Sequence, residues 1–200
     1  MLAQVNNISL AFNDLGTGLP FVFLHAFPLN RTMWADQEKA LSTQFRVITI
    51  DLRGHGESDA PLWHYSLDQA ADDVCGLMDH LSIRQPILVG LSMGGYIALA
   101  FYRKYAERVK GLVLADGKRA RFEMPQLAYT QGAGAIAEIM IPKLLSPATI
   151  QTRPELVQQV RTMIKGNQVS GIGGDLMAMA ERPDSQPLLP QISCPAQIIV

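Results

Sequence analysis

Residues 86–106 read PILVGLSMGGYIALAFYRKYA. The part up to Leu91 is a continuous apolar run of strand length, which is typical of a strand buried on both faces of a sheet. The part after Ser92 is apolar on nearly every side until Arg103, so we expect a largely buried helix there. A strand, a turn and a helix therefore meet at the sequence GLSMG, residues 90–94.

The pattern G-x-S-x-G at such a turn is the signature of a nucleophile elbow. A sharp strand-to-helix turn holds the serine in a strained backbone conformation and lifts its Oγ clear of the sheet. Gly90 and Gly94 allow the backbone to pass closely, and Gly95 adds room for contact between helix and sheet. We predict that Ser92 is a catalytic nucleophile. The alternative interpretation is an ordinary serine in a glycine-rich turn.

Further apolar runs of strand length alternate with segments of helical periodicity along the chain. The predicted strands are Val5–Phe12, Phe21–Leu24, Arg46–Ile50, Val109–Ala115 and Cys194–Val200. Ser66 and Gln69 form a capping-box pattern before a helix. This alternation predicts an α/β fold, in which a mostly parallel sheet is flanked by helices. The last strand, 194–200, is expected to be buried, and to form an apolar edge if no strand follows it.

Between Gly117 and Gln191 many prolines separate short helical stretches, and no strand-length run interrupts them. We predict a helical lid at 117–191, inserted between an N-terminal core at 1–116 and the start of a C-terminal core part at 192–200. The sequence GIGG at 171–174 is interpreted as a hinge of this lid. No strand is followed by G-x-G-x-x-G, which excludes a dinucleotide-binding loop.

An enzyme that transfers acyl groups needs two N–H groups aimed at the oxyanion of its tetrahedral intermediate. The residue after the nucleophile, Met93, supplies one of them. The loop that follows the third strand supplies the other, and Phe27 is the predicted donor, with Pro28 fixing the direction of the chain. His25, in the same loop, is expected to tie it to neighbouring backbone and not to act as the base.

The composition excludes several classes of function. The 200 residues are 48% hydrophobic and carry a formal net charge of -1, without a basic stripe, so we expect no nucleic-acid partner. No apolar stretch is long enough to span a membrane, and no secretory signal is present, which predicts a cytoplasmic protein. Cys75 and Cys194 match no metal or redox spacing, and Cys75 is expected to be a buried structural thiol. We expect neither a metal nor another cofactor.

The chain resembles the α/β-hydrolase superfamily in three features that occur in the expected order: the loop at 25–28, the sequence DLRGHGES at 51–58, and the elbow at 90–95. The likeness is greatest to the branch of 3-oxoadipate enol-lactonases, arylesterases and non-haem haloperoxidases. The resemblance implies that Ser92 is the nucleophile and that the amides of Phe27 and Met93 form the oxyanion hole. The chain differs from the family at Ala26, where the family usually has glycine. This difference predicts that the oxyanion loop is slightly displaced.

The resemblance also implies an acid and a histidine that follow the nucleophile in the chain, in the order Ser, Asp or Glu, His. All four histidines precede Ser92: His25, His55, His64 and His80. His55, between two glycines, is expected to stabilise its loop, and His64 and His80 to lie on the surface. Asp116 is a minor candidate for the acid. We therefore expect the acid and histidine beyond Val200, and the 200 residues to be a nearly inactive fragment of a longer enzyme.

The predicted function is hydrolysis of a small carboxylic ester or lactone through an acyl-enzyme on Ser92, with that small molecule as the partner. Lid residues such as Met124, Leu127, Met140, Met163, Met177 and Met179 would suit an apolar substrate, although they would equally serve as the core of the lid itself. Two alternatives stay open: a hydrolase of carbon–carbon bonds on the same scaffold, and a non-catalytic module that binds a small ligand.

Overall fold

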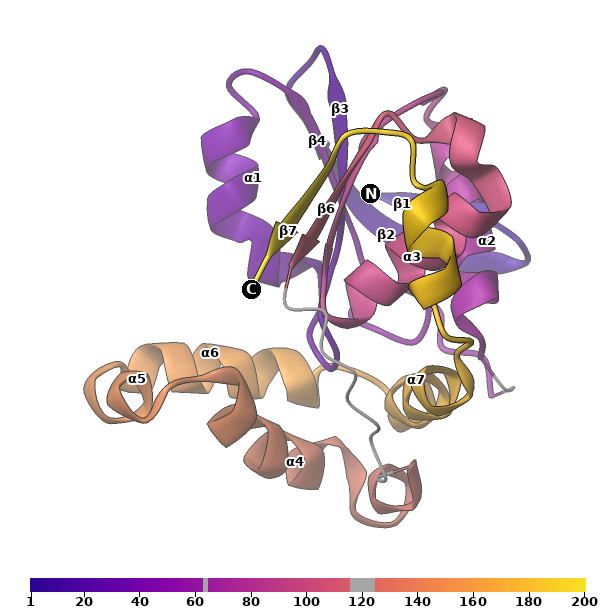
Figure 1. The fold of residues 1–200 in the computed structure, drawn as a ribbon. Coiled ribbons are helices and arrows are strands. Elements are labelled where there is room, and N and C mark those ends of the chain that lie inside the picture. The colour runs from indigo at the N-terminus through magenta and orange to yellow at the C-terminus, as the bar shows by residue number, and fades with distance from the viewer. Residues whose placement is uncertain (63–64, 116–124) are drawn as a thin grey trace.

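The structure is a computed structural model that describes residues 1–62, 65–115 and 125–200, with the backbone alone at 125–128. Within these residues, seven strands form one sheet in the order β1-β2-β4-β3-β5-β6-β7 (Figure 1). The strands are β1 (Leu2–Val5), β2 (Ile8–Leu15), β3 (Pro20–Leu24), β4 (Arg46–Ile50), β5 (Ile87–Leu91), β6 (Gly111–Ala115) and β7 (Ala196–Ile199). From β4 to β7 every pair of neighbours is parallel, whereas β2 is antiparallel to both of its neighbours, β1 and β4. The predicted α/β fold is confirmed.

Helices cover both faces of this sheet. They are α1 (Ala35–Leu41), α2 (Leu67–His80) and α3 (Met93–Tyr105), with the short 3-10 helices η1 (Arg31–Trp34) and η2 (Ala106–Arg108) beside them. Helix α1 lies on one face, and α2 and α3 lie on the other (Figure 1). The predicted cap of α2 is confirmed, because the Ser66 side chain accepts a hydrogen bond from the Gln69 N–H.

The central strands are buried on both faces, which explains their uninterrupted apolar sequences. On the side of α1, Phe23 and Val47 pack with Trp34. The neighbouring residues Val22 and Ile48 point to the opposite side and belong to the larger core beneath α2 and α3. Because successive side chains of a strand point to opposite faces, a strand covered on both sides needs apolar residues at every position.

A set of helices lies beyond the carboxyl ends of the parallel strands (Figure 1). They are α4 (Pro125–Leu144), which is kinked at Gly132, α5 (Pro147–Thr152), α6 (Pro154–Lys165) and α7 (Val169–Glu181). The 3-10 helix η3 (Gln186–Gln191) follows α7 and lies beside α3 (Figure 1). The described part of this segment is helical, as expected from short helical stretches that prolines separate. The start of the lid at 117 stays a prediction, because residues 116–124 lie outside the described ranges.

The N-terminal strand prediction is wrong in one respect. Residues Val5–Phe12 do not form one strand, because Asn6 and Asn7 have φ values of 47° and 64° and turn the chain. Val5 pairs with Ile8 across this turn, so β1 and β2 form a tight hairpin. Two consecutive asparagines tolerate the positive φ values of a two-residue hairpin turn.

The prediction of a hinge at 171–174 is also wrong. These glycines lie inside α7 and are buried. A Cβ atom on Gly171 would overlap the main chain of Gly54, so the small residues serve close packing of this helix and not flexibility.

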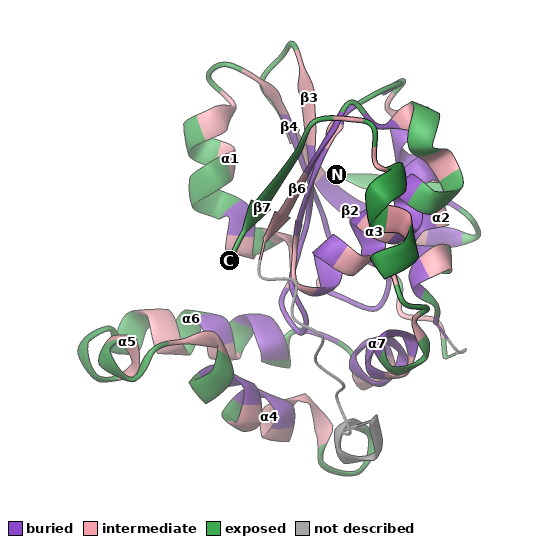
Figure 2. Ribbon diagram, in the orientation of Figure 1, coloured by how far each residue is buried: buried purple, intermediate pink, exposed green. Residues whose placement is uncertain are grey.

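The last strand was expected to be buried, but every residue of β7 is exposed, as Figure 2 shows. Its backbone pairs with β6, and Ile198 nevertheless has 69% of its surface exposed. Within the described ranges nothing covers this strand, so it is the apolar edge that the sequence also indicates.

Candidate active site

Ser92 stands at the junction of β5 and α3, with φ 53° and ψ −110°. Residues that have a Cβ atom rarely adopt this backbone conformation, so the backbone is strained at Ser92. Two kinds of hydrogen bond hold the turn. The Ser92 N–H donates to the Ala115 carbonyl of β6 over 2.9 Å, and the Ser92 carbonyl accepts from the N–H groups of Gly95 and Tyr96. The side chain is half-buried at the end of the sheet.

The glycines around Ser92 allow main chains to touch. A Cβ on Gly90 would overlap the carbonyl of Gly94, and a Cβ on Gly94 would overlap the carbonyl of Leu24. Gly95 is different, because its nearest neighbour would lie 3.5 Å from an added Cβ, which is an ordinary contact. The predicted close approach therefore applies to Gly90 and Gly94, and Gly95 is not required for it.

The loop after β3 reaches the same end of the sheet as the elbow. β3 and β5 are parallel neighbours, with Leu24 opposite Gly90, so the residues that follow each strand lie side by side. Phe27 and Met93 are both buried, with 3% and 0% of their surface exposed. Ala26 does not have a positive φ, so a side chain at this position causes no left-handed strain. The Leu29 N–H donates to the Ala26 carbonyl over 2.8 Å and closes the loop.

His25 is tied to backbone on both of its ring nitrogens. Its Nε2 accepts a 3.1 Å hydrogen bond from the Leu52 N–H, so Nδ1, which lies 3.1 Å from the Ala26 carbonyl, carries the proton. Burial, and secondarily the nearby His55, hold the pKa of His25 well below its usual value. The structural role expected for His25 agrees with these contacts.

The sequence at 51–58 folds into a loop in which several polar side chains bond to backbone. Asp51 accepts hydrogen bonds from the Arg31 and Glu57 N–H groups over 2.7 and 2.9 Å, and also pairs with the Arg31 guanidinium. Ser58 donates to the Asp51 carbonyl over 2.6 Å and accepts from the Ala11 N–H over 2.8 Å. The loop is thereby fixed to β2 and to the segment before α1.

A buried ion pair anchors the same loop to α2. The Arg53 guanidinium donates to both carboxylate oxygens of Asp73, over 2.5 and 2.8 Å, and neither side chain exceeds 5% exposure. Asn6, in the hairpin turn, donates a further hydrogen bond to Asp73 over 3.1 Å. The sequence contained Arg53 in its motif, but no local pattern identified Asp73 as the partner.

Among the contacts of the helical segment with the core are two that involve buried polar side chains, and sequence reasoning missed both. The Asp175 carboxylate of α7 lies 2.6 Å from Nε2 of His55, with both side chains buried. Asn167, between α6 and α7, bonds to Pro28, Leu29 and Gly56. A single acid in the apolar helix 169–180 was the one available signal for Asp175. The expected loop-stabilising role of His55 agrees with its bond to Asp175.

The other candidates are not brought to the elbow by any described contact. His80 is exposed, as expected, with its ring edge against Phe12. His64 and the minor acid candidate Asp116 lie outside the described residues. Cys75 is buried, and burial raises the pKa of its thiol, which fits a structural role.

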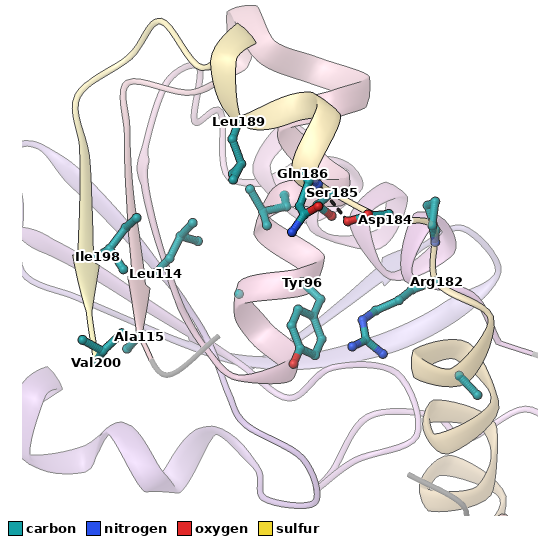
Figure 3. Close-up of a pocket in the computed structure, with 14 residues that line it drawn as sticks. Tyr96, Leu114, Ala115, Arg182, Asp184, Ser185, Gln186, Leu189, Ile198 and Val200 are labelled. Carbon is teal, nitrogen blue, oxygen red and sulfur yellow. Dashed lines mark hydrogen bonds between the residues drawn. The ribbon is translucent and has the colours of Figure 1, made fainter. Parts of the chain in front are cut away.

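A cavity of about 410 Å³ runs along α3, β6 and β7, starting one turn after Ser92 (Figure 3). Leu99, Leu114, Leu189 and Ile198 form its apolar wall. At its other end the Arg182 guanidinium lies over the Tyr96 ring, 4.3 Å from its centroid (Figure 3). Neither Ser92 nor Phe27 lines this cavity.

The lid methionines that the structure describes do not line this cavity either. Met140, Met163 and Met179 are buried in the main apolar cluster, which corresponds to the alternative interpretation, a core of the helical segment. Met177 is half-buried, whereas Met124 and the side chain of Leu127 lie outside the described residues.

Over the part of the chain that the structure describes, no helix is both long and apolar enough to cross a membrane. In the same residues, no three histidine, cysteine or carboxylate side chains are grouped as a metal site would require.

The sequence profile of the alpha/beta hydrolase fold matches residues 20–138, which include the elbow and both loops beside it. The chain belongs to the α/β-hydrolase family. It is 30% identical to 3-oxoadipate enol-lactonase 2 of Acinetobacter baylyi, over 89% of the chain and 68% of that relative. It is 42% identical to a non-heme chloroperoxidase of Kitasatospora aureofaciens, over 45% of the chain and 33% of that relative.

A solved esterase from Thermogutta terrifontis superimposes with a TM-score of 0.93 and 41% identity, over 99% of the chain and 78% of the esterase. The predicted branch of the α/β-hydrolases is thereby confirmed. The chain spans only 47% and 40% of the length of two other curated relatives, so the activity of the whole protein belongs to the proposal that follows.

Proposed function

We propose that this α/β-hydrolase cleaves small carboxylic esters or lactones through an acyl-enzyme on Ser92. The observation that carries the proposal is the strained backbone of Ser92, at φ 53° and ψ −110°, between a parallel strand and a buried helix. Strain of this kind persists where function requires a side chain to stand in one place. Relatives named as an enol-lactonase and an esterase support ester chemistry.

In the proposed reaction, Oγ of Ser92 attacks the substrate carbonyl carbon while a histidine takes the hydroxyl proton. The carbonyl oxygen becomes an oxyanion, to which the N–H groups of Phe27 and Met93 donate. The bond to the alcohol or enolate then breaks, and this leaving group takes the proton from the histidine. Water attacks the resulting ester of Ser92 with the same histidine as base, and the carboxylic acid is released.

We infer that none of the described histidines is the base of this scheme. Both ring nitrogens of His25 are engaged with backbone, and His55 is held by Asp175. His80 is exposed at the end of α2. We therefore keep the prediction that the acid and histidine follow Val200 in the reading frame, and that residues 1–200 alone are nearly inactive. Reading the source DNA past the codon for Val200 tests this directly.

The function is tested by expressing the full reading frame and measuring hydrolysis of p-nitrophenyl acetate and of small lactones. A fluorophosphonate should label Ser92, as located by peptide mass spectrometry. Ser92→Ala should lower kcat/KM by about 10³-fold or more. Ser42→Ala, at the end of α1, is the matched control and should leave the rate unchanged.

The two alternative functions predict different results in the same experiment. A hydrolase of carbon–carbon bonds would cleave a vinylogous diketone faster than any ester, again with loss in Ser92→Ala. A module that only binds ligands would show no labelling of Ser92 and no turnover. Preference for long-chain or highly charged esters would contradict the small apolar substrate.

A further inference from the structure

Asn167 occupies a fixed position between the helical segment and the core. It follows α6, where its N–H donates to the Ile164 carbonyl over 3.2 Å, and it precedes α7. The residue has only 4% of its surface exposed. A buried amide must satisfy its donors and its acceptor within the protein, because an unpaired polar group costs free energy there.

The Asn167 amide meets both loops at the end of the sheet. Its Oδ1 accepts a hydrogen bond from the Gly56 N–H over 2.7 Å. Its Nδ2 donates to the carbonyls of Pro28 and Leu29, over 2.7 and 3.3 Å. A main-chain N–H on one side and two carbonyls on the other fix the orientation of the amide, since a flipped amide would oppose donor to donor.

Pro28 has no N–H, so its carbonyl is the polar main-chain group through which this part of the loop can be held. Phe27, whose N–H belongs to the proposed oxyanion hole, immediately precedes Pro28. The bond from Asn167 therefore acts one residue from the predicted donor.

The same helical segment contacts the core at neighbouring points. Asp175 of α7 forms a buried pair with His55 of the loop after β4. The His55 ring packs against those of His25 and Phe27, with centroids 4.9 and 6.3 Å apart. Close packing of Gly171 on Gly54 brings α7 onto the loop after β4. These contacts fix the start of α7, which Asn167 precedes by two residues, against the loop after β4.

We propose that Asn167 is a positioning residue for the oxyanion hole: it holds the Pro28 carbonyl so that the Phe27 N–H stays aimed at the oxyanion. The inference rests on the proposed function. Since it places a residue of the helical segment behind the oxyanion loop, the lid contributes to the rate of the chemical step as well as covering the site.

Asn167→Asp is the sharpest test, because it keeps the shape and the acceptor for Gly56 but replaces the donor to Pro28 by a second oxygen. In the full translated protein, each variant is titrated with a fluorophosphonate so that kcat refers to active sites. We expect kcat on p-nitrophenyl acetate to fall by about 10- to 100-fold, with KM changed less than about threefold, as misplacement of a catalytic group does.

A second readout separates positioning from a merely structural role. Sulfur is a weaker hydrogen-bond acceptor than oxygen, so an intact oxyanion hole favours an oxoester over its thionoester. We expect this preference to shrink in Asn167→Asp. Ser170→Ala is the matched control, since the Ser170 hydroxyl donates to the Ala60 carbonyl over 3.3 Å without contacting the loop at 25–29. It should leave kcat and the preference unchanged.

Unchanged kcat per site and unchanged preference in a folded Asn167→Asp protein would overturn the inference. If that variant does not fold, Asn167→Ser is assayed in the same way; if neither folds, the residue is structural and the inference is overturned as well. Activity that survives Ser92→Ala would instead refute the proposed function, so the two failures are distinguishable.

Discussion

Gly94 lies against the main-chain carbonyl of Leu24, so closely that a Cβ atom on the glycine would overlap it. The helix that carries the elbow thus touches the neighbouring strand backbone to backbone. This contact brings the turn at Ser92 next to the loop that follows β3, and it depends on the absence of one methyl group.

Gly94→Ala should therefore destabilise the protein by about 3 kcal/mol, because the overlapped atoms belong to main chain that cannot move aside cheaply. Gly95→Ala is the matched control, since its Cβ would find only an ordinary contact at 3.5 Å. Alanine favours helix over glycine, so this variant should be neutral or up to about 1 kcal/mol more stable. Urea unfolding of the two variants measures the difference, and equal stabilities would refute the close-contact argument.

Ser92 should be replaceable by glycine with a gain in stability. At φ 53° and ψ −110° a side chain strains the backbone, and glycine relieves this strain. Ser92→Gly should unfold about 2 to 4 °C above Ser92→Ala, which corresponds to about 1 kcal/mol after the larger unfolded-state entropy of glycine is subtracted. Calorimetry compares the two, and neither should react with a fluorophosphonate. A lower melting temperature for the glycine variant would mean that the residue is not strained.

The pair of Arg53 and Asp73 should be far more sensitive to mutation than a surface pair. Arg53→Met leaves the buried Asp73 carboxylate without its partner, and we expect a loss of about 3 to 5 kcal/mol. Arg161→Met removes the partner of Glu138, whose side chain is 60% exposed, and should lower the stability far less. Chemical denaturation gives both values. Similar small losses would show that the buried pair does not anchor its loop.

The free energy of unfolding should fall in mild acid, because the pKa of the buried His25 is lower in the folded protein than in the unfolded chain. Burial keeps the pKa of His25 below its usual value, so in this range the unfolded chain binds a proton that the folded protein does not. The free energy of unfolding should therefore decrease as the pH drops below about 6.5, by about 1 kcal/mol near pH 5.5. His25→Gln should weaken this dependence, whereas His80→Gln, at an exposed position, should not. Thermal melts at pH 7.5 and 5.5 provide the comparison, and identical slopes in all three proteins would contradict it.

Several features could be predicted because their cause lies within a few neighbouring residues. The elbow needs a strand, a turn and a helix in immediate succession, and residues 86–106 contain all three. The cap of α2 depends on Ser66 and on a residue three positions later. The GIGG sequence at 171–174 misled prediction for the opposite reason. Glycine permits both flexibility and close approach, and only the neighbouring Gly54 shows that close approach applies here.

The sequence by itself determined the alternation of strands and helices, the doubly buried sheet and the place of Ser92, because apolar periodicity and local turn geometry are encoded in adjacent residues. Only the tertiary structure decided that Asp175 meets His55 and that Asn167 meets Pro28 and Gly56, across separations of more than a hundred residues. An amide or a carboxylate bonds equally well to many partners. Its partner is therefore chosen by the packing of whole helices against the sheet, which no short stretch of sequence contains.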